Sequence, residues 1–340
     1  MNSMSIRDFL FRYIVGHLYY LPILRHSFWA RRRVFRPMYQ RLAATCPCKV
    51  PSTEKTVVYM VKEETTFSGG LSDRLRGITA IYQMCKQLGL RFKINFENPP
   101  LQDYLQPKDY DWHLRPGEID YDMRHSYPCT ILTYHPYDDQ KERYAQEHIL
   151  KMFLRKRYRQ IHIYSNMKIA DEAFGPIFHE LFRPTDELQQ VIDSHLTKIG
   201  GKGSYVSCTF RFRQLLGDFK EGGDTLPVEQ RKAYIERCVR TVEHLYQSCR
   251  TTILVTSDSG TFLSRVSSLP YVYVVPGKVV HIGFTFDASK QVYMKSFVDY
   301  YMLSYAKTVY LVLDKLMYHS GFPLRAALLN RAEYKEINLL

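Results

Sequence analysis

The fold is decided by the stretch "TVVYMVKEETTFSGGLSDRLRGITAIYQMCKQLGLRFKINF", residues 56–96. It begins and ends with short β-branched and aromatic runs typical of strands, at residues 56–61 and 91–96. Between these runs, apolar side chains recur at helical spacing, at Leu71, Leu75, Ile78, Tyr82, Cys85 and Leu88. The pattern predicts a strand, a loop, a helix and a second strand, with Gly69 and Gly70 where the loop enters the helix.

The second half of the chain alternates in the same way. Runs typical of strands occupy residues 204–212, 251–257, 271–275 and 308–313. Helical patterns follow near residues 228–249, near 291–306 and after Pro323. Between the halves, residues 97–135 are rich in proline and aromatic residues, so we expect a loop-rich region that is a functional insertion or the wall of a cleft. The alternation as a whole predicts an α/β protein with parallel sheets covered by helices on both faces.

Length and charge narrow the class of protein. A chain of 340 residues with 45% hydrophobic and 24% charged residues can bury two ordinary cores. Its net charge is +13, and residues 1–50 contribute +8 of that, with nine Lys/Arg against Asp8 alone. The basic excess therefore belongs to an N-terminal arm. A nucleic-acid-binding protein would instead carry a basic stripe on its folded domain, so that alternative is disfavoured.

The arm, residues 1–50, mixes aromatic and aliphatic side chains with arginine. Arg7, Asp8 and Arg12 interrupt its apolar stretch and Pro22 breaks it, so it falls short of the ~20 apolar residues of a membrane-spanning helix. The basic cluster follows the apolar part, unlike in a signal peptide. Two interpretations stay open: a helix at an anionic membrane surface, or an arm whose aromatic residues pack on the domain behind it.

Seven scattered cysteines are most simply reduced thiols of a cytoplasmic protein. Cys46 and Cys48 have no second Cys/His pair at metal-ligand spacing, so no zinc site is predicted. We expect a cytoplasmic protein that meets the inner face of the cytoplasmic membrane peripherally if the arm binds lipid.

Two arginines follow a predicted strand in "TFRFRQLLGDF", residues 209–219. Period-2 alternation directs Arg211 and Arg213 to the same side, where both can bind a diphosphate. The alternative is an edge strand whose arginines face water. Asp258 and Ser259 follow the next strand, where either can also cap a helix.

A third cluster, Ser320 and Gly321, enters the last helix. Glycine, serine and arginine clusters at several strand-to-helix transitions would line one edge of a sheet, where free helix N–H groups bind anions. This convergence predicts a nucleotide-phosphate site.

Six ordered blocks carry a resemblance to a known family: "SGGLSDRLRG", "LQDYLQPKDYDW", "FHELFRPTDEL", "TFRFRQLLGDF", "VTSDSGTFL" and "HSGFPLRAA". Over about residues 56–330 the chain resembles the GDP-fucose-dependent fucosyltransferases, the superfamily of nodulation and core α1,6-, α1,2- and protein O-fucosyltransferases, and in particular their bacterial polysaccharide-type members. The resemblance implies a GT-B architecture, two Rossmann-like domains facing across a cleft.

The implied organisation is an arm over residues 1–50, an acceptor-side domain over 51–195 and a GDP-sugar-binding domain over 196–340. The implied reaction is transfer of fucose from GDP-fucose, with inversion and without metal or other cofactor. The acceptor would be a glycan or a lipid-linked oligosaccharide in polysaccharide biosynthesis. A GT-B enzyme that uses another nucleotide sugar is the alternative.

The resemblance also assigns residues. Arg211 matches the arginine that binds the β-phosphate, and Asp258 matches the acid at or near the guanine. The remaining donor-binding candidates are Gly69, Gly70, Arg74, Arg213, Ser259, Ser320, Gly321 and Phe322. Thr209 stands where the family usually has histidine, so any role of that imidazole is absent or has moved to another residue.

The chemistry requires cations at the leaving diphosphate and a base near the acceptor hydroxyl. Arg211 and Arg213 would stabilise the negative charge that grows on the β-phosphate. Asp218 is the first candidate for the base and Asp73 the second. The structural alternatives are that Asp218 orders a turn, and that Asp73 caps the helix or pairs with Arg76.

Overall fold

The computed structural model describes residues 16–340, apart from residues 63–64, 66–68, 134–138, 220, 222, 284 and 286–287. Two compact units are present: the chain up to Asn98 together with Pro107–Leu181, and Pro99–Gln106 together with Phe182–Leu340. The boundary expected between residues 195 and 196 falls inside α7 (Asp186–Ile199), which belongs to the second unit. Residues 1–15 of the predicted arm lie outside the described residues.

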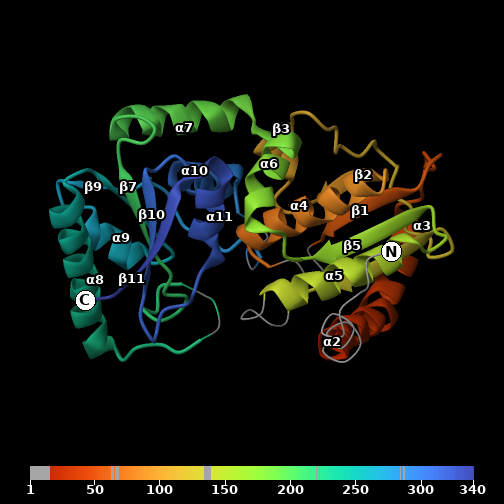
Figure 1. Cartoon of the computed structure of the whole chain (residues 1–340), viewed down its shortest axis with the longest axis horizontal. Helices are drawn as coiled ribbons and strands as arrows, with labels where there is room; N and C mark the ends of the chain where they lie inside the picture. The colour runs from red at the N-terminus through yellow and green to blue at the C-terminus, as the bar shows by residue number, and fades with distance from the viewer. Residues whose placement is uncertain are drawn as a thin grey trace, which may run out of the picture. The chain divides into compact units, whose positions relative to one another are not determined.

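The first unit is built on a parallel four-stranded sheet of order β2-β1-β5-β4 (Figure 1). Its strands are β1 (Thr56–Val61), β2 (Arg91–Phe96), β4 (Ser126–Ile131) and β5 (Gln160–Ser165). Its helices after the arm are α4 (Leu71–Gln87), α5 (Asp139–Leu154) and α6 (Asp171–Leu181). The strand, loop, helix and strand expected over residues 56–96 are therefore confirmed, and β1 pairs with β2 from Thr56 opposite Arg91 to Val61 opposite Phe96.

Strand β4 corrects one expectation, because it lies in the region that we expected to be loop. All six of its residues are buried, and Pro128 stands in the middle. Proline cannot donate to a strand neighbour, so it is confined to edge strands. Strand β4 is such an edge, since it pairs with β5 alone, Pro128 opposite His162. A short ladder between β3 (Leu105–Pro107) and β6 (Phe182–Pro184) and the 3-10 turn η3 (Leu101–Asp103) occupy part of the same region.

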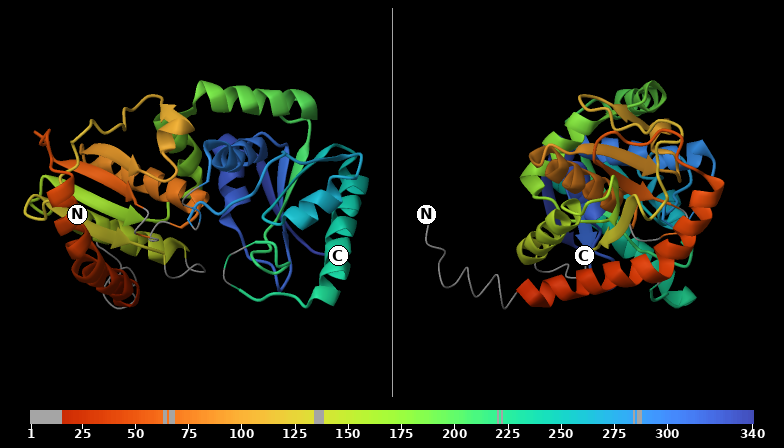
Figure 2. Two further views of the ribbon diagram at one scale, coloured as in Figure 1. Left: turned by 180° about the vertical axis from the view of Figure 1, so that it is seen from behind. Right: turned by 90° about the vertical axis from the view of Figure 1, so that its right-hand side faces the viewer.

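The arm packs on the first unit as one long helical segment (red in Figure 2): α2 (Gly16–Ala30), the wider π-helical turn η2 (Arg31–Phe35) and α3 (Arg36–Thr45). Pro22 does not end the helix, which continues through it. Phe35 and Tyr39 are fully buried, and the ring of Phe35 stacks on Tyr164 of β5 at 4.5 Å. The packing interpretation therefore holds for this face of the arm. None of the helices in the described part of the chain is long and apolar enough to cross a membrane.

The second unit is built on a parallel five-stranded sheet of order β11-β10-β7-β8-β9. Its strands are β7 (Val206–Phe210), β8 (Ile253–Ser257), β9 (Val272–Tyr273), β10 (Thr308–Leu313) and β11 (Glu333–Asn338). Besides α7, its helices are α8 (Val228–Cys249), α9 (Gly260–Val266), α10 (Lys290–Ser304) and α11 (Gly321–Asn330). Helices α8 and α9 cover one face of the sheet, and α10 and α11 cover the other (Figure 1).

The strand order of this unit determines where a ligand can bind. The chain runs outward from β7 through β8 to β9, then returns to place β10 and β11 on the other side of β7. The order therefore reverses between β7 and β10. In open α/β sheets, the crevice outside the carboxyl ends of the strands at such a switch point is where ligands bind.

Two details of the second unit differ from the expectation. Helix α11 begins at Gly321 and not after Pro323, so Pro323 lies in its first turn. The N–H groups of the first turn have no partner within the helix, so proline, which has no N–H, is tolerated there. Strand β11 was not predicted. Its residues, Glu333–Asn338, are exposed or half-buried at the edge of the sheet. Edge strands carry charged side chains, and these hide the alternation of apolar and polar residues from which a strand is predicted.

Candidate functional site

The segment after β7 is held by one acid from the next strand. Arg211 directly follows β7, and its Nη1 donates to Asp258 Oδ2 at 2.7 Å. Asp258 also accepts the backbone N–H groups of Phe212 (2.9 Å) and Arg213 (2.6 Å). Its side chain is 2% exposed. Burial raises the pKa of the Asp258 carboxyl, while the charge of Arg211 and these N–H groups oppose that rise. Asp258 therefore anchors the loop and orients Arg211.

Two arginines converge on one carboxylate in this loop. The other terminal nitrogen of Arg211 pairs with Glu221, and Nε of Arg213 lies 3.5 Å from the second oxygen of the same carboxylate. Nε of Arg213 is buried and makes no hydrogen bond. Arg213 adopts a positive φ of 55°, an uncommon conformation for a residue with a side chain. The loop thus holds an anionic group between two guanidinium groups.

The loop after β10 lies beside the same segment. The backbone N–H of Tyr318 donates to the carbonyl of Arg211 at 3.0 Å, and the guanidinium of Arg213 lies 5.2 Å from the centre of the Tyr318 ring. Strands β7 and β10 are neighbours, so these contacts lie at the switch point of the sheet. The two arginines and the loop that leads into α11 therefore meet where the strand order reverses.

The small residues of the predicted site cap helices. Ser320 precedes α11, and its hydroxyl accepts the N–H of Phe322 at 3.3 Å. A side chain added to Gly321 would meet no atom within 4 Å, so the backbone there is open. Ser259 caps α9 by accepting the N–H of Phe262 at 3.1 Å. The capping alternative is confirmed for Ser259.

Asp218 has two hydrogen-bond partners at the start of α9. Its Oδ2 accepts from Ser259 Oγ at 2.7 Å and from the backbone N–H of Thr261 at 2.8 Å. These bonds support the ordering role that is the alternative to a base. Thr209, at the position where the family usually has histidine, is buried, and its hydroxyl lies 2.8 Å from that of Thr256 in β8.

The remaining candidates lie in the first unit, around the start of α4. The buried guanidinium of Arg74 donates to the carbonyls of Gly69 (2.8 Å) and Asn98 (3.0 Å). Gly69 has a φ of 69°, and a Cβ there would lie 2.7 Å from the carboxylate of Asp73. Arg74 therefore maintains the glycine turn, with Gly70 as the N-cap of α4. Asp73 pairs with Arg76 at 3.0 Å, as one of the alternatives expected.

The structure thus separates the candidates into two groups by unit. Gly69, Gly70, Asp73 and Arg74 share the start of α4, and the others gather at the carboxyl ends of β7, β8 and β10. The sequence reasoning missed Glu221 and Tyr318, both in loops without periodicity. The only signal for Glu221 in the sequence is that it is an acid beside glycines, shortly after two arginines. In the described part of the chain, no group of three or more His, Cys, Asp or Glu could hold a metal ion.

Each of the two α/β units contains a parallel sheet, and the fold is similar to that of GT-B-like fucosyltransferase structures. A mutant of Arabidopsis thaliana FUT1 in complex with GDP is similar to this chain with a TM-score of 0.51 and 12% identity, over 89% of this chain and 78% of that one. The expected α/β fold with parallel sheets is confirmed, and the similarity to this structure is one of fold.

Two structures of the fucosyltransferase NodZ are also similar in fold. NodZ alpha-1,6-fucosyltransferase soaked with GDP-fucose has a TM-score of 0.49 and 14% identity, over 82% of this chain and 93% of that one. NodZ from Bradyrhizobium has a TM-score of 0.49 and 12% identity over the same shares of the two chains, 82% and 93%. No protein-family model matches the chain, and no curated protein matches it in sequence.

Proposed function

We propose that this protein is a glycosyltransferase that transfers fucose from GDP-fucose to a glycan acceptor, with inversion and without a metal ion. One observation carries the proposal: Arg211 and Arg213 converge on a single carboxylate at the switch point of the second sheet. Paired guanidinium groups suit the oxygens of a diphosphate, and the fold shared with FUT1 supports the same class of donor.

In this proposal, the diphosphate of the donor displaces Glu221 from Arg211 and Arg213. When the bond from fucose C1 to the β-phosphate breaks, negative charge grows on that phosphate. Fixed guanidinium groups already aimed there stabilise this charge without reorganisation. Asp258, bonded to Arg211 and to the backbone of the loop, keeps the cation in place and acts on the donor through it.

The acceptor hydroxyl must lose a proton as it attacks C1, ideally to a carboxylate within hydrogen-bond reach. Asp218 remains the first candidate and Asp73 the second. Asp218 accepts hydrogen bonds at the start of α9, and Asp73 pairs with Arg76. To act as the base, either carboxylate must give up one of these interactions and accept a hydrogen bond from the acceptor hydroxyl instead. The lipid-linked or free glycan acceptor and a site of action at the inner face of the cytoplasmic membrane are parts of the same proposal.

The donor assignment is tested by thermal denaturation of the full chain in the presence of a metal chelator. A ligand at ~100 times its Kd adds about 2.7 kcal/mol to the free energy of unfolding. GDP should therefore raise the melting temperature well above the value with UDP or CMP. An equal rise with UDP would support the alternative, an enzyme that uses another nucleotide sugar.

The role of Arg211 is tested by transfer assays with GDP-fucose. Arg211→Ala should lower turnover by a factor on the order of 10² or more and weaken GDP binding less, because the cation contributes most in the transition state. The matched control is Arg265→Ala, since Arg265 also pairs with a carboxylate of the second unit, Glu236, but on its surface. Full activity of Arg211→Ala would refute the assignment.

A further inference from the structure

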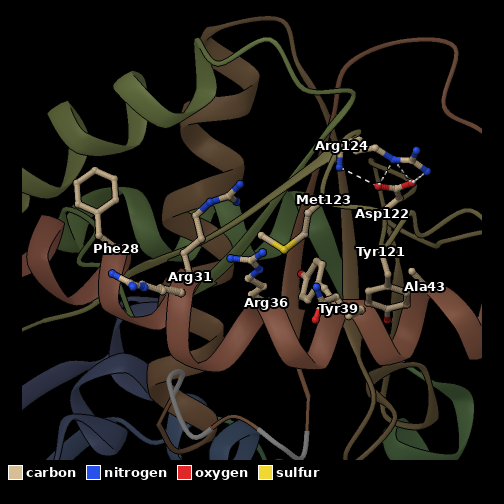
Figure 3. A pocket seen from close by; sticks show the side chains of 11 residues that line it. Phe28, Arg31, Arg36, Tyr39, Ala43, Tyr121, Asp122, Met123 and Arg124 are labelled. Atoms are coloured by element: carbon tan, nitrogen blue, oxygen red, sulfur yellow. Dashed lines mark hydrogen bonds and ion pairs between the residues drawn. The ribbon is translucent and has the colours of Figure 1, made fainter.

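A second arginine-rich site lies in the first unit, on the arm. A hollow of about 640 Å³ opens between the helical segment η2–α3 and the turn at Tyr121–Arg124 (Figure 3). Four arginines line it, Arg31, Arg32, Arg36 and Arg124, beside a single acid, Asp122. Tyr39 and Tyr121 contribute aromatic walls. The proposed function uses none of these residues.

The acid of the hollow is already neutralised. Oδ2 of Asp122 accepts from Nη2 of Arg124 at 2.5 Å and from its Nε at 2.9 Å, and Oδ1 accepts from the same Nε at 3.0 Å, so the two side chains pair at the rim. Among the residues that the structure describes, Arg31, Arg32 and Arg36 have no carboxylate within ion-pair distance. The hollow therefore carries three positive charges that the surrounding side chains do not balance.

Arg31 is the most constrained of the three. Its guanidinium lies 4.3 Å from the centre of the Tyr127 ring, and its Nη1 is buried without a hydrogen bond. A buried donor without a hydrogen bond is destabilising, and like charges on one turn of a helix repel each other. A multiply charged anion would accept a hydrogen bond from the buried donor and would also reduce the repulsion between the arginines. A phosphate group offers several oxygens to guanidinium groups at once.

The outward face of α2, the helix that continues into η2, is apolar as well as basic. Leu21, Phe28 and Trp29 are 62%, 54% and 51% exposed, and Phe28 also lines the hollow. Arg25 of α2 and Arg32 of η2 are exposed as well. A soluble phosphate would not need these apolar side chains. A lipid surface would bury them at its acyl boundary while the arginines bind the headgroups.

We infer that the hollow binds the phosphate of an anionic lipid headgroup, while Leu21, Phe28 and Trp29 enter the boundary of the bilayer. Arg31, Arg32 and Arg36 hold the phosphate, and the buried face of the arm, through Phe35 and Tyr39, transmits the attachment to the first unit. The site lies in a different unit from Arg211, so the inference stands even if the donor assignment fails.

The test uses the full chain and vesicles of phosphatidylcholine with or without phosphatidic acid, at about 0.1 M salt. Each basic residue near an anionic surface contributes about 1 kcal/mol, so replacing two should weaken binding tenfold or more. The double variant Arg32→Gln with Arg36→Gln should therefore lose most of its sedimentation with the anionic vesicles. Both side chains are exposed and unpaired among the described residues, so the melting temperature should not fall.

A matched control removes the same charge elsewhere. Arg183→Gln with Arg240→Gln changes two exposed arginines of the second unit and should sediment like the wild type. Fluorescence gives an independent readout, because the chain has two tryptophans and Trp112 is already buried at 1% exposure. A blue shift on adding anionic vesicles therefore reports on Trp29.

Three results would overturn the inference. The first is a wild-type chain that does not sediment with phosphatidic acid vesicles. The second is equal loss of sedimentation in the hollow variant and the control, which would indicate general charge attraction. The third is stabilisation of the wild type, but not of the hollow variant, by inorganic pyrophosphate without any vesicle binding, which would assign the hollow to a soluble phosphate.

Discussion

Arg211 and Asp258 form an ion pair of 2.7 Å across the carboxyl ends of two adjacent parallel strands, although 47 residues separate them in the sequence. The same carboxylate accepts two backbone N–H groups of the loop that carries Arg213. One acid therefore sets both the direction of a cation and the conformation of the loop around it. The loop can present its arginines to an anion without first becoming ordered.

Replacing Asp258 by asparagine should harm both stability and ligand binding. Removing one partner of a buried ion pair costs about 3–5 kcal/mol, because the other charge is left uncompensated. We expect Asp258→Asn to lower the free energy of unfolding measured in urea by about 3 kcal/mol and to weaken GDP binding. Glu236→Gln, which removes the surface partner of Arg265, is the control and should change neither. Unchanged GDP affinity in Asp258→Asn would contradict the anchoring role.

Replacing Glu221 should strengthen GDP binding. Its carboxylate lies between Arg211 and Arg213, where the proposed diphosphate binds, so the two compete. Glu221→Gln should raise GDP affinity by roughly tenfold or more, because a hydrogen bond to a charged group contributes ~1.5–3 kcal/mol. The control is Asp224→Asn, an exposed acid of the same loop. If calorimetry finds weaker binding in Glu221→Gln alone, Glu221 helps to hold the donor and does not compete with it.

Two asparagine variants distinguish the candidates for the base. Asp218→Asn keeps the size of the side chain but removes the proton acceptor, so transfer should fall by a factor on the order of 10² to 10⁴ while GDP binding is spared. Hydrolysis of GDP-fucose should be measured beside transfer, because hydrolysis needs no sugar acceptor. If Asp73→Asn loses transfer and Asp218→Asn does not, the base belongs to the glycine turn of the first unit.

The arm should contribute strongly to the stability of the first unit. Phe35 is fully buried against Tyr164, and removing a buried phenyl ring costs about 3–5 kcal/mol. Phe35→Ala should therefore lower the melting temperature by several degrees. Trp29→Ala, at a position that is 51% exposed on the opposite face, should leave the free energy of unfolding within about 0.5 kcal/mol of the wild type. Similar losses in both variants would contradict the assignment of the two faces.

Acid should destabilise the protein through His162. Burial lowers the pKa of His162 from 6.5 to about 3, and its ring accepts from Tyr39 and donates to Gln160. Below pH ~6.5 the unfolded chain binds a proton that the folded chain does not, so this contribution to stability is present above that pH and is lost as the pH falls towards 3. The slope for this one group is about 1.4 kcal/mol per pH unit.

Urea denaturation between about pH 4 and 7 measures this slope. His162→Gln can keep one hydrogen bond donor and one acceptor but does not titrate, so its free energy of unfolding should depend less steeply on pH. Parallel curves for the wild type and the variant would show that other groups cause the acid sensitivity.

Much of the fold could be predicted because its signals are local. Strand β1, helix α4 and strand β2 follow from periods of 2 and 3.6 residues within 41 consecutive residues, 56–96. Helix α8 was expected over the same residues that it occupies, Val228–Cys249. Strands β4 and β11 were missed, and each lies at a sheet edge, where proline or exposed charges interrupt the pattern. Strand β5, which lies inside its sheet, was not predicted either.

The sequence by itself determined the alternation of strands and helices and the positions of Arg211, Arg213, Asp258 and Ser320 after strands, since both depend on spacing along the chain. Only the tertiary structure decided what these side chains contact. Glu221 lies between two arginines, Asp218 is bonded at the start of α9, and Arg74 maintains a glycine turn. The tertiary structure also decided which face of the arm is buried and which is exposed. In each case the contacting residues come from segments distant in the sequence, which meet only when the parallel sheets form.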